Sequence, residues 1–257
     1  MAERTSDHPS SALRSVLVFL LTASVLVTAW HLAIVGLRIP PYLVPSPMMV
    51  LEAFRTKWSV IALHTSYTLS SAALGLCISL ALAIGLAVAF TASENLANAA
   101  SPIVIAFRSM PVTAIAPIIT LALGRGMATS VVVVSIVTFF PLLVNLRRGL
   151  VSSDRNADEL LHVYMATRWQ RLRYVHFRYA LPYMFAGLRV AGASAILGAM
   201  LSEWITGLPG LGNLILDSGE LRETALLWAA VLTSVFIALG VFRGASAAER
   251  HFVNWRR

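Results

Sequence analysis

The feature that most constrains this chain is its series of long apolar runs without Asp, Glu, Lys or Arg. The longest extends from Ser59 to Ser93, with His64 as its only possible charge. About 20 consecutive apolar residues suffice for a helix to cross the hydrocarbon core of a bilayer. Within that core a helix satisfies its own backbone hydrogen bonds. The run therefore predicts a membrane-spanning helix that is longer than one span, so that it tilts or extends beyond the bilayer.

Further apolar runs repeat this pattern along the chain. Charged residues make up only 12% of the sequence, about half the share of a soluble domain, so a water-facing globule is excluded. We predict an all-α fold, a polytopic membrane bundle of about six transmembrane helices formed as a single domain over residues 1–257. Besides Ser59–Ser93, the predicted spans are Ser15–Gly36, Ser109–Gly124, Met127–Leu146, Pro182–Ser202 and Ala225–Phe242. The limits of the third span, Ser109–Gly124, are the least defined.

The basic residues predict how the bundle is oriented. Arg and Lys favour the cytoplasmic loops of membrane proteins, and most of them lie on one side here if both termini are cytoplasmic. That side includes the longest polar loop, at about residues 147–181. The net charge of +8 is thus spread between apolar runs instead of forming a basic stripe, which argues against nucleic-acid binding.

The inner loop carries signals for two short helices. Asn156 followed by Glu159 predicts the start of the first, and Thr167 followed by Gln170 forms a capping box that starts the second. We therefore expect a two-helix knuckle with a break near Ala166. Such an element could lie in the headgroup layer with its arginines on phosphates, or offer an apolar helix face to the groove of a soluble partner. The pattern alone leaves both interpretations open.

The sequence of this knuckle resembles a known signature. The stretch "ELLHVYMATRWQ" from Glu159 to Gln170, with "LP" at Leu181–Pro182 and "FAGLR" at Phe185–Arg189, is similar to the EAA motif of the permease subunits of bacterial ABC importers. That motif reads roughly E-A-A-x-x-x-G-A-S-R-W-Q. Segments such as "SEWITGLPGLGNLI" at Ser202–Ile215 extend the resemblance over nearly the whole chain, towards the nitrate, sulfonate and taurine branch of the family.

The resemblance implies a function and a set of partners. The chain would be the transmembrane permease subunit of an ABC importer in a bacterial inner membrane, forming the pathway for a small solute. Its expected partners are a second permease copy, two cytoplasmic ATPase subunits that bind ATP and Mg, and a periplasmic or lipid-anchored substrate-binding protein. No cofactor or metal is expected in this chain itself. The residues expected to dock to the ATPase are Glu159, Leu160, Leu161, Tyr164, Met165, Ala166, Thr167, Arg168 and Trp169.

The chain departs from the motif at its alanine pair and at its glycine. The alanine pair of the family is Leu160 and Leu161, and the family's glycine is Met165. A glycine at the break of a knuckle supplies a backbone angle that methionine tolerates poorly. The turn is therefore expected to differ here, or the ATPase groove to be adapted to it.

Within the spans, small residues recur at every fourth position. One row runs from Ser71 through Gly75 to Ala87, and another from Gly187 through Ala199 to Glu203. Small residues let helix backbones approach closely in lipid, so both rows predict packing faces. Glu203 is the exceptional member, because a carboxylate within a span is costly and a candidate for function. It is our pathway candidate, the alternative being a local structural contact near the outer end of its helix.

Other functions fit the sequence less well. No cluster of nucleophile and base, or of metal ligands, points to an enzyme. The only lysine, Lys57, lies in "FRTKW" without the glycine-rich cradle of a P-loop, so ATP hydrolysis is expected in a separate subunit. The alternative function is a channel or secondary transporter that works without an ATPase, although ion-coupled proteins usually place several charges near the midplane.

Overall fold

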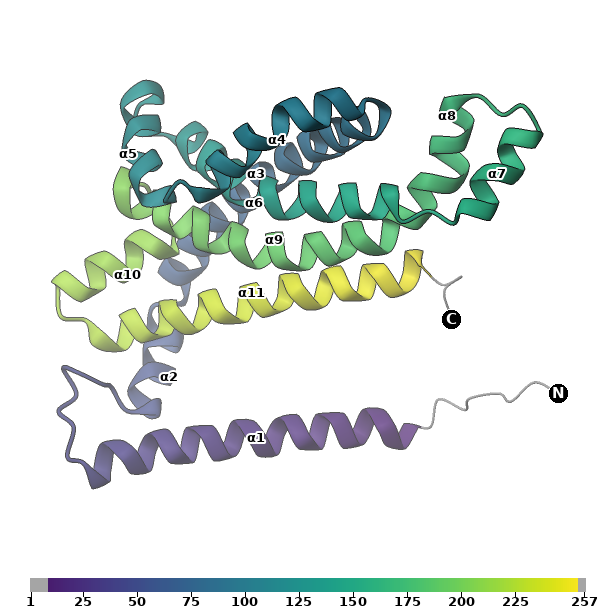
Figure 1. Cartoon of the computed structure of the whole chain (residues 1–257). Coiled ribbons are helices and arrows are strands. Elements are labelled where there is room, and N and C mark those ends of the chain that lie inside the picture. The colour runs from purple at the N-terminus through teal and green to yellow at the C-terminus, as the bar shows by residue number, and fades with distance from the viewer. Residues whose placement is uncertain (1–8, 254–257) are drawn as a thin grey trace.

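The structure is a computed structural model that describes residues 9–253, and the chain is helical along most of this range (Figure 1). In chain order the elements are α1 (Pro9–Gly36), α2 (Pro47–Thr56), α3 (Trp58–Ala92), α4 (Glu94–Ser109), α5 (Val112–Leu123), α6 (Met127–Val151), α7 (Arg155–Val163), α8 (Arg168–Arg171), the π-helical turn η1 (Leu172–His176), α9 (Phe177–Thr206), α10 (Leu211–Glu220) and α11 (Thr224–Phe252).

Within residues 9–253, four helical segments are both long and apolar enough to cross a bilayer. They are α3, α6, the continuous segment from Arg168 to Thr206, and α11. The all-α membrane fold is therefore confirmed. The apolar part of α1, Leu20–Gly36, and α5 are shorter, so the number of crossings beyond these four stays a prediction.

The third predicted span, residues 109–124, is a shorter helix than the sequence suggested. α5 has 12 residues, which extend roughly 18 Å at 1.5 Å per residue, well short of a hydrocarbon core of about 30 Å. Pro111 separates α5 from α4, because proline disfavours a helical conformation in the residue before it. Gly124, at φ 78°, ends α5 in a conformation that glycine adopts readily.

The apolar run at residues 59–93 forms one continuous helix, α3, of 35 residues. At 1.5 Å per residue it is roughly 52 Å long, which exceeds a hydrocarbon core of about 30 Å. The short helix α2 precedes it. Ser46 caps α2 by accepting a hydrogen bond from the backbone N–H of Met49, and Pro47 occupies the first turn, where its missing N–H costs nothing.

The rows of small residues are packing faces, as predicted. Gly75 of α3 lies so close to α6 that a Cβ there would be 2.6 Å from Val134. Gly187 of α9 approaches α6 in the same way, near Asn145 and Leu142. The core of the bundle therefore consists of α3 and α9 packed on the two sides of α6. The buried members of the two rows are Ser71, Gly75, Ser79, Ala83 and Ala87 on α3, and Gly187, Ala191, Ala195, Ala199 and Glu203 on α9.

The remaining helices surround this core. α11 packs on α9, where Arg189 forms an ion pair with Glu249 and Phe185 stacks on Phe252. α1 lies at the edge of the fold (Figure 1), and its Trp30 stacks on Trp228 of α11 with ring centroids 5.3 Å apart. α7 and α8 lie at the same end as the start of α1 and the end of α11, whereas α10 lies at the opposite end (Figure 1).

Candidate functional site

Residues 155–171, which comprise α7, the connecting turn and α8, form the predicted two-helix knuckle and extend beyond the bundle (Figure 1). The capping box predicted for its second helix is present. The Thr167 hydroxyl accepts from the Gln170 N–H at 3.3 Å, and the Gln170 side-chain oxygen accepts from the Thr167 N–H at 2.7 Å. These reciprocal bonds satisfy two N–H groups that a helix start leaves open, which fixes where the second helix begins.

The first helix of the knuckle starts differently from the sequence expectation. Its N-cap is Asp154 instead of Asn156, because the Asp154 carboxylate accepts from the Asn156 N–H at 3.1 Å. Asp is as good a cap as Asn, so the Asn156 assignment was wrong by two residues. The knuckle itself is as predicted.

Met165 occupies the break between the two helices with φ 55°. This is the left-handed conformation that a glycine would adopt without a steric penalty, and it costs other residues about 1–2 kcal/mol. The turn therefore keeps a backbone shape that suits glycine although the residue is methionine. The amide of Met165 donates to the carbonyl of His162 and the amide of Ala166 to the carbonyl of Leu161, which holds the turn in place.

The surface of the knuckle is unusually apolar for a segment outside the spans. Tyr164 and Met165 are 75% and 88% exposed, and Trp169 is 66% exposed. Val163, which the sequence analysis did not include, is 78% exposed. Exposed apolar side chains gathered on one segment make it a candidate interaction site. We call it the knuckle patch, and its members are Leu160, Val163, Tyr164, Met165 and Trp169.

The other predicted docking residues lie around this patch. Glu159, Thr167 and Arg168 are exposed, whereas Leu161 and Ala166 are half-buried. Leu161 and Ala166 therefore offer less surface to a partner than the members of the knuckle patch.

A π-helical turn joins the knuckle to the bundle. η1 continues directly from α8 into α9, and such turns often occur at functional sites. The Nδ1 atom of His176 lies 2.9 Å from the carbonyl oxygen of Leu150 and 3.0 Å from the Ser153 hydroxyl. This contact ties η1 to the end of α6, and η1 continues into α9, so the knuckle is connected to both helices.

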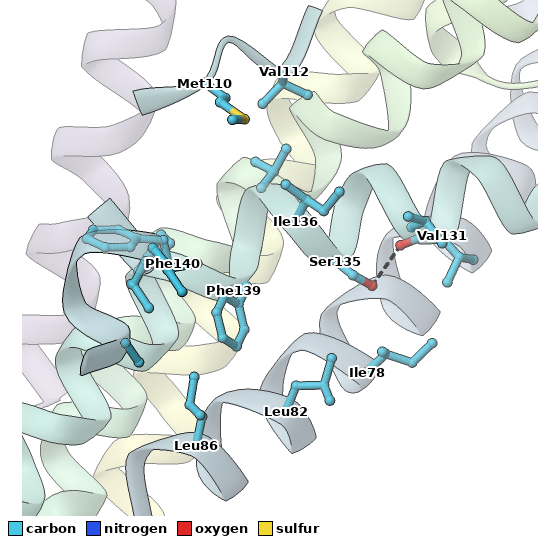
Figure 2. Close-up of a pocket in the computed structure, with 16 residues that line it drawn as sticks. Ile78, Leu82, Leu86, Met110, Val112, Val131, Ser135, Ile136, Phe139 and Phe140 are labelled. Carbon is cyan, nitrogen blue, oxygen red and sulfur yellow. Dashed lines mark hydrogen bonds between the residues drawn. The ribbon is translucent and has the colours of Figure 1, made fainter. Parts of the chain in front are cut away.

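A second candidate site is a cavity of about 740 Å³ between α3, α4, α5 and α6. Figure 2 shows Ile78, Leu82 and Leu86 of α3 facing Phe139 of α6 across it. Among the described residues that line it, Ser135 is the only polar side chain, and its hydroxyl donates to the carbonyl of Val131 at 2.7 Å. The described lining thus offers apolar and aromatic surface.

Glu203 lies outside this cavity, in a buried hydrogen-bond network. It is 2% exposed. One carboxylate oxygen accepts from the Thr68 hydroxyl and the other from the Gly212 N–H, each at 2.8 Å. The Leu211 N–H in turn donates to the Thr68 hydroxyl oxygen at 2.8 Å. Nearby, His64 Nδ1 lies 2.8 Å from the Gly210 carbonyl oxygen. We call these six residues the outer network.

Sequence reasoning found Glu203 but missed its partners. Thr68 and His64 lie in the same long apolar run, whereas Gly210 and Gly212 lie at the start of α10, more than 130 positions away. The signal available was the spacing of His64 and Thr68, which places both on one face of α3. That spacing does not predict the pairing with the distant start of α10.

Comparison with known proteins identifies the family. Residues 81–252 match the profile of the binding-protein-dependent transport system inner membrane component. The chain belongs to this family. It is 33% identical to the riboflavin transport system permease protein RibX of Chloroflexus aurantiacus, over 91% of this chain and 88% of that protein. It is also 35% identical to the formylaminopyrimidine transport permease protein ThiX of Halalkalibacterium halodurans, over 67% and 69%.

The fold and the branch agree with this assignment. A chain of the inward-facing MetNI methionine ABC transporter matches with a TM-score of 0.62 at 19% identity, over 80% of this chain and 99% of that one. Matches to permeases named for taurine, aliphatic sulfonates and nitrate confirm the predicted branch. The chain is thus a membrane-embedded permease subunit of an ABC importer, and the channel or secondary-transporter alternative is disfavoured.

Proposed function

We propose that two copies of this chain form a solute pathway, each copy docking its knuckle patch to one of two cytoplasmic ATPase subunits. An external binding protein, soluble or lipid-anchored, delivers the solute. ATP and Mg bind to the ATPase subunits, so this chain contributes no catalytic residue. The termini are cytoplasmic and residues 1–257 act as one permease domain. The residues at the ends, 1–8 and 254–257, lie outside the described residues.

The observation that carries this proposal is the knuckle patch. A segment outside the spans exposes two aromatic side chains and a methionine, and aromatic residues and methionine are enriched at protein interfaces. Its position at the end of the bundle where α1 starts and α11 finishes (Figure 1) fits a cytoplasmic partner. η1 and His176 then connect the patch to α6 and α9.

A charge reversal tests the docking. We expect Glu159→Lys to lower ATP-driven uptake in reconstituted liposomes while the chain still inserts in the membrane, because it places a cation at the start of the patch. The matched control is Glu220→Lys, an exposed glutamate at the other end of the bundle. Wild-type uptake in Glu159→Lys at equal protein amounts would remove the docking assignment.

We further propose that the solute is a flat nitrogen heterocycle. The relatives at 33% and 35% identity are named for riboflavin and formylaminopyrimidine, whereas the taurine relative is 24% identical. The cavity, lined by apolar residues with Phe139 and Phe140, suits a ring better than a small anion. Competition assays with riboflavin, a pyrimidine, taurine and nitrate test this, and inhibition by taurine or nitrate alone contradicts it.

A further inference from the structure

We propose that Glu203 is a positioning residue, whose carboxylate clamps the first turn of α10 to α3 and so fixes the outer end of the pathway. The inference rests on the proposed function, because it concerns the pathway of the same importer. Glu203, the pathway candidate, then acts through α10 and not through contact with the solute.

The carboxylate of Glu203 is occupied by neighbouring protein groups. Both oxygens of Glu203 already accept hydrogen bonds, from Thr68 and from Gly212, at 2.8 Å each. The side chain is 2% exposed, and the cavity of Figure 2 is lined by other residues. The carboxylate therefore acts on its protein neighbours.

The start of α10 has no capping side chain of its own. Its N-cap residue is Gly210, which has no side chain to accept from the first-turn N–H groups. Glu203 supplies the missing acceptor for Gly212 from a different helix, and Thr68 supplies one for Leu211. A negative charge at a helix start is also favourable because it complements the helix dipole. The order of α10 thus depends on residues of α9 and α3.

The start of α10 fits tightly against α9. A Cβ on Gly210 would lie 2.0 Å from Cδ of Glu203, and a Cβ on Gly212 would lie 2.3 Å from the carbonyl oxygen of Met200. The indole N–H of Trp204 also donates to the Gly212 carbonyl. Gly210 is therefore in direct contact with the Glu203 carboxylate, and Gly212 with the α9 backbone. α10 cannot shift without breaking these contacts.

The clamp is connected to the rest of that end of the bundle. Leu211 and Leu214 of α10 pack in one apolar cluster with Val50 of α2, Ile61 of α3 and Leu226 of α11. Fixing the first turn of α10 therefore fixes a cluster shared by four helices. Any relative movement of α3 and α9 at this end must either carry this cluster along or open the clamp.

The variants separate a clamp from a charge that faces the solute. Glu203→Gln keeps one oxygen that accepts from the Gly212 N–H, and its amide group can donate to the Thr68 hydroxyl oxygen. The Thr68 hydroxyl then donates to the His64 carbonyl oxygen, which lies 3.3 Å away. Thr68→Val removes the partner and leaves the charge, and Thr68→Ser restores the hydroxyl. Glu220→Gln, an exposed glutamate of α10 itself, is the control.

The first readout is ATP-driven uptake by the full transporter in liposomes. We expect Thr68→Val to lose uptake by about tenfold, the size expected when a buried carboxylate loses a partner, and Thr68→Ser and Glu203→Gln to retain most of it. A charge that acts on the solute predicts the reverse, with Glu203→Gln defective and Thr68→Val normal, and that result would overturn the proposal. Uptake absent from the wild-type transporter itself refutes the proposed function instead.

The second readout does not require transport. Spin labels on α10 and α3, at Leu216→Cys and Ser59→Cys in a Cys77→Ser background, report the distance between the two helices by pulsed EPR. We expect Thr68→Val to broaden or shift the distance distribution and Glu220→Gln to leave it unchanged. An unchanged distribution in Thr68→Val overturns the clamp, whatever the uptake assay gives.

Discussion

At the scale of single residues, Met165 shows how a motif can keep its backbone shape after losing the residue that suits it. Its φ of 55° lies in the region where a side chain is penalised by about 1–2 kcal/mol. The neighbouring backbone hydrogen bonds from Met165 and Ala166 hold this conformation. The exposed methionine in turn adds apolar surface to the knuckle patch.

We predict that Met165→Gly makes the turn more stable, by up to about 1 kcal/mol, because the gain from removing strain exceeds the extra freedom of glycine in the unfolded chain. Hydrogen exchange of the amides at residues 160–170 measures this, with slower exchange expected. Tyr164→Gly is the matched control, since Tyr164 has φ −76° and gains nothing from glycine. Faster exchange in Met165→Gly contradicts the strain argument.

Residue-scale features were predictable from the sequence where they are local. The capping box of Thr167 and Gln170 depends on residues three positions apart, and it is present as predicted. The first cap was misplaced because Asp154 and Asn156 are both good caps and the sequence does not rank them. The outer network was not predictable, since it joins residues more than 130 positions apart.

At the scale of helices, the close approach of α3 to α6 depends on Gly75. A Cβ at this position would lie 2.6 Å from Val134 and 2.9 Å from the carbonyl oxygen of Val131. The second of these neighbours is backbone and cannot rotate away. The row of small residues predicted this packing face, because spacing alone decides which residues share a helix face.

We predict that Gly75→Ala lowers the free energy of unfolding by about 1–3 kcal/mol, as expected for overpacking. Gly85→Ala, on the same helix with nothing within 4 Å of its Cβ, is expected to be neutral or slightly stabilising. Thermal unfolding of the two variants in the same detergent compares them. Equal unfolding midpoints in the two variants would show that the added methyl group at Gly75 costs no stability, which would contradict this account.

The limits of α5 could not be read from hydropathy. The apolar run at residues 109–124 is long enough to suggest a span, but Pro111 and Gly124 restrict the helix to Val112–Leu123. A hydropathy average does not register these backbone effects. For the same reason the π-helical turn η1 is not apparent in the sequence, where residues 168–206 form one helical pattern.

At the scale of the whole molecule, the two candidate sites lie at opposite ends of the fold. The knuckle patch lies at one end and the outer network at the other, and the core of α3, α6 and α9 connects them. The membrane character and the family were predictable because hydropathy and the EAA motif are continuous stretches of sequence. The cavity between α3, α4, α5 and α6 was not predictable, because its lining comes from four separate helices.

The central claim is that the knuckle patch docks an ATPase in a complex of two permease copies and two ATPase subunits. The most direct test is purification of the tagged chain from its membrane in mild detergent, followed by native mass spectrometry. The account predicts a complex of two and two, lost in Tyr164→Ala and Trp169→Ala but kept in Leu221→Ala, an equally exposed apolar side chain at the other end. A chain that purifies without an ATPase, and that still moves solute in liposomes without ATP, would contradict it.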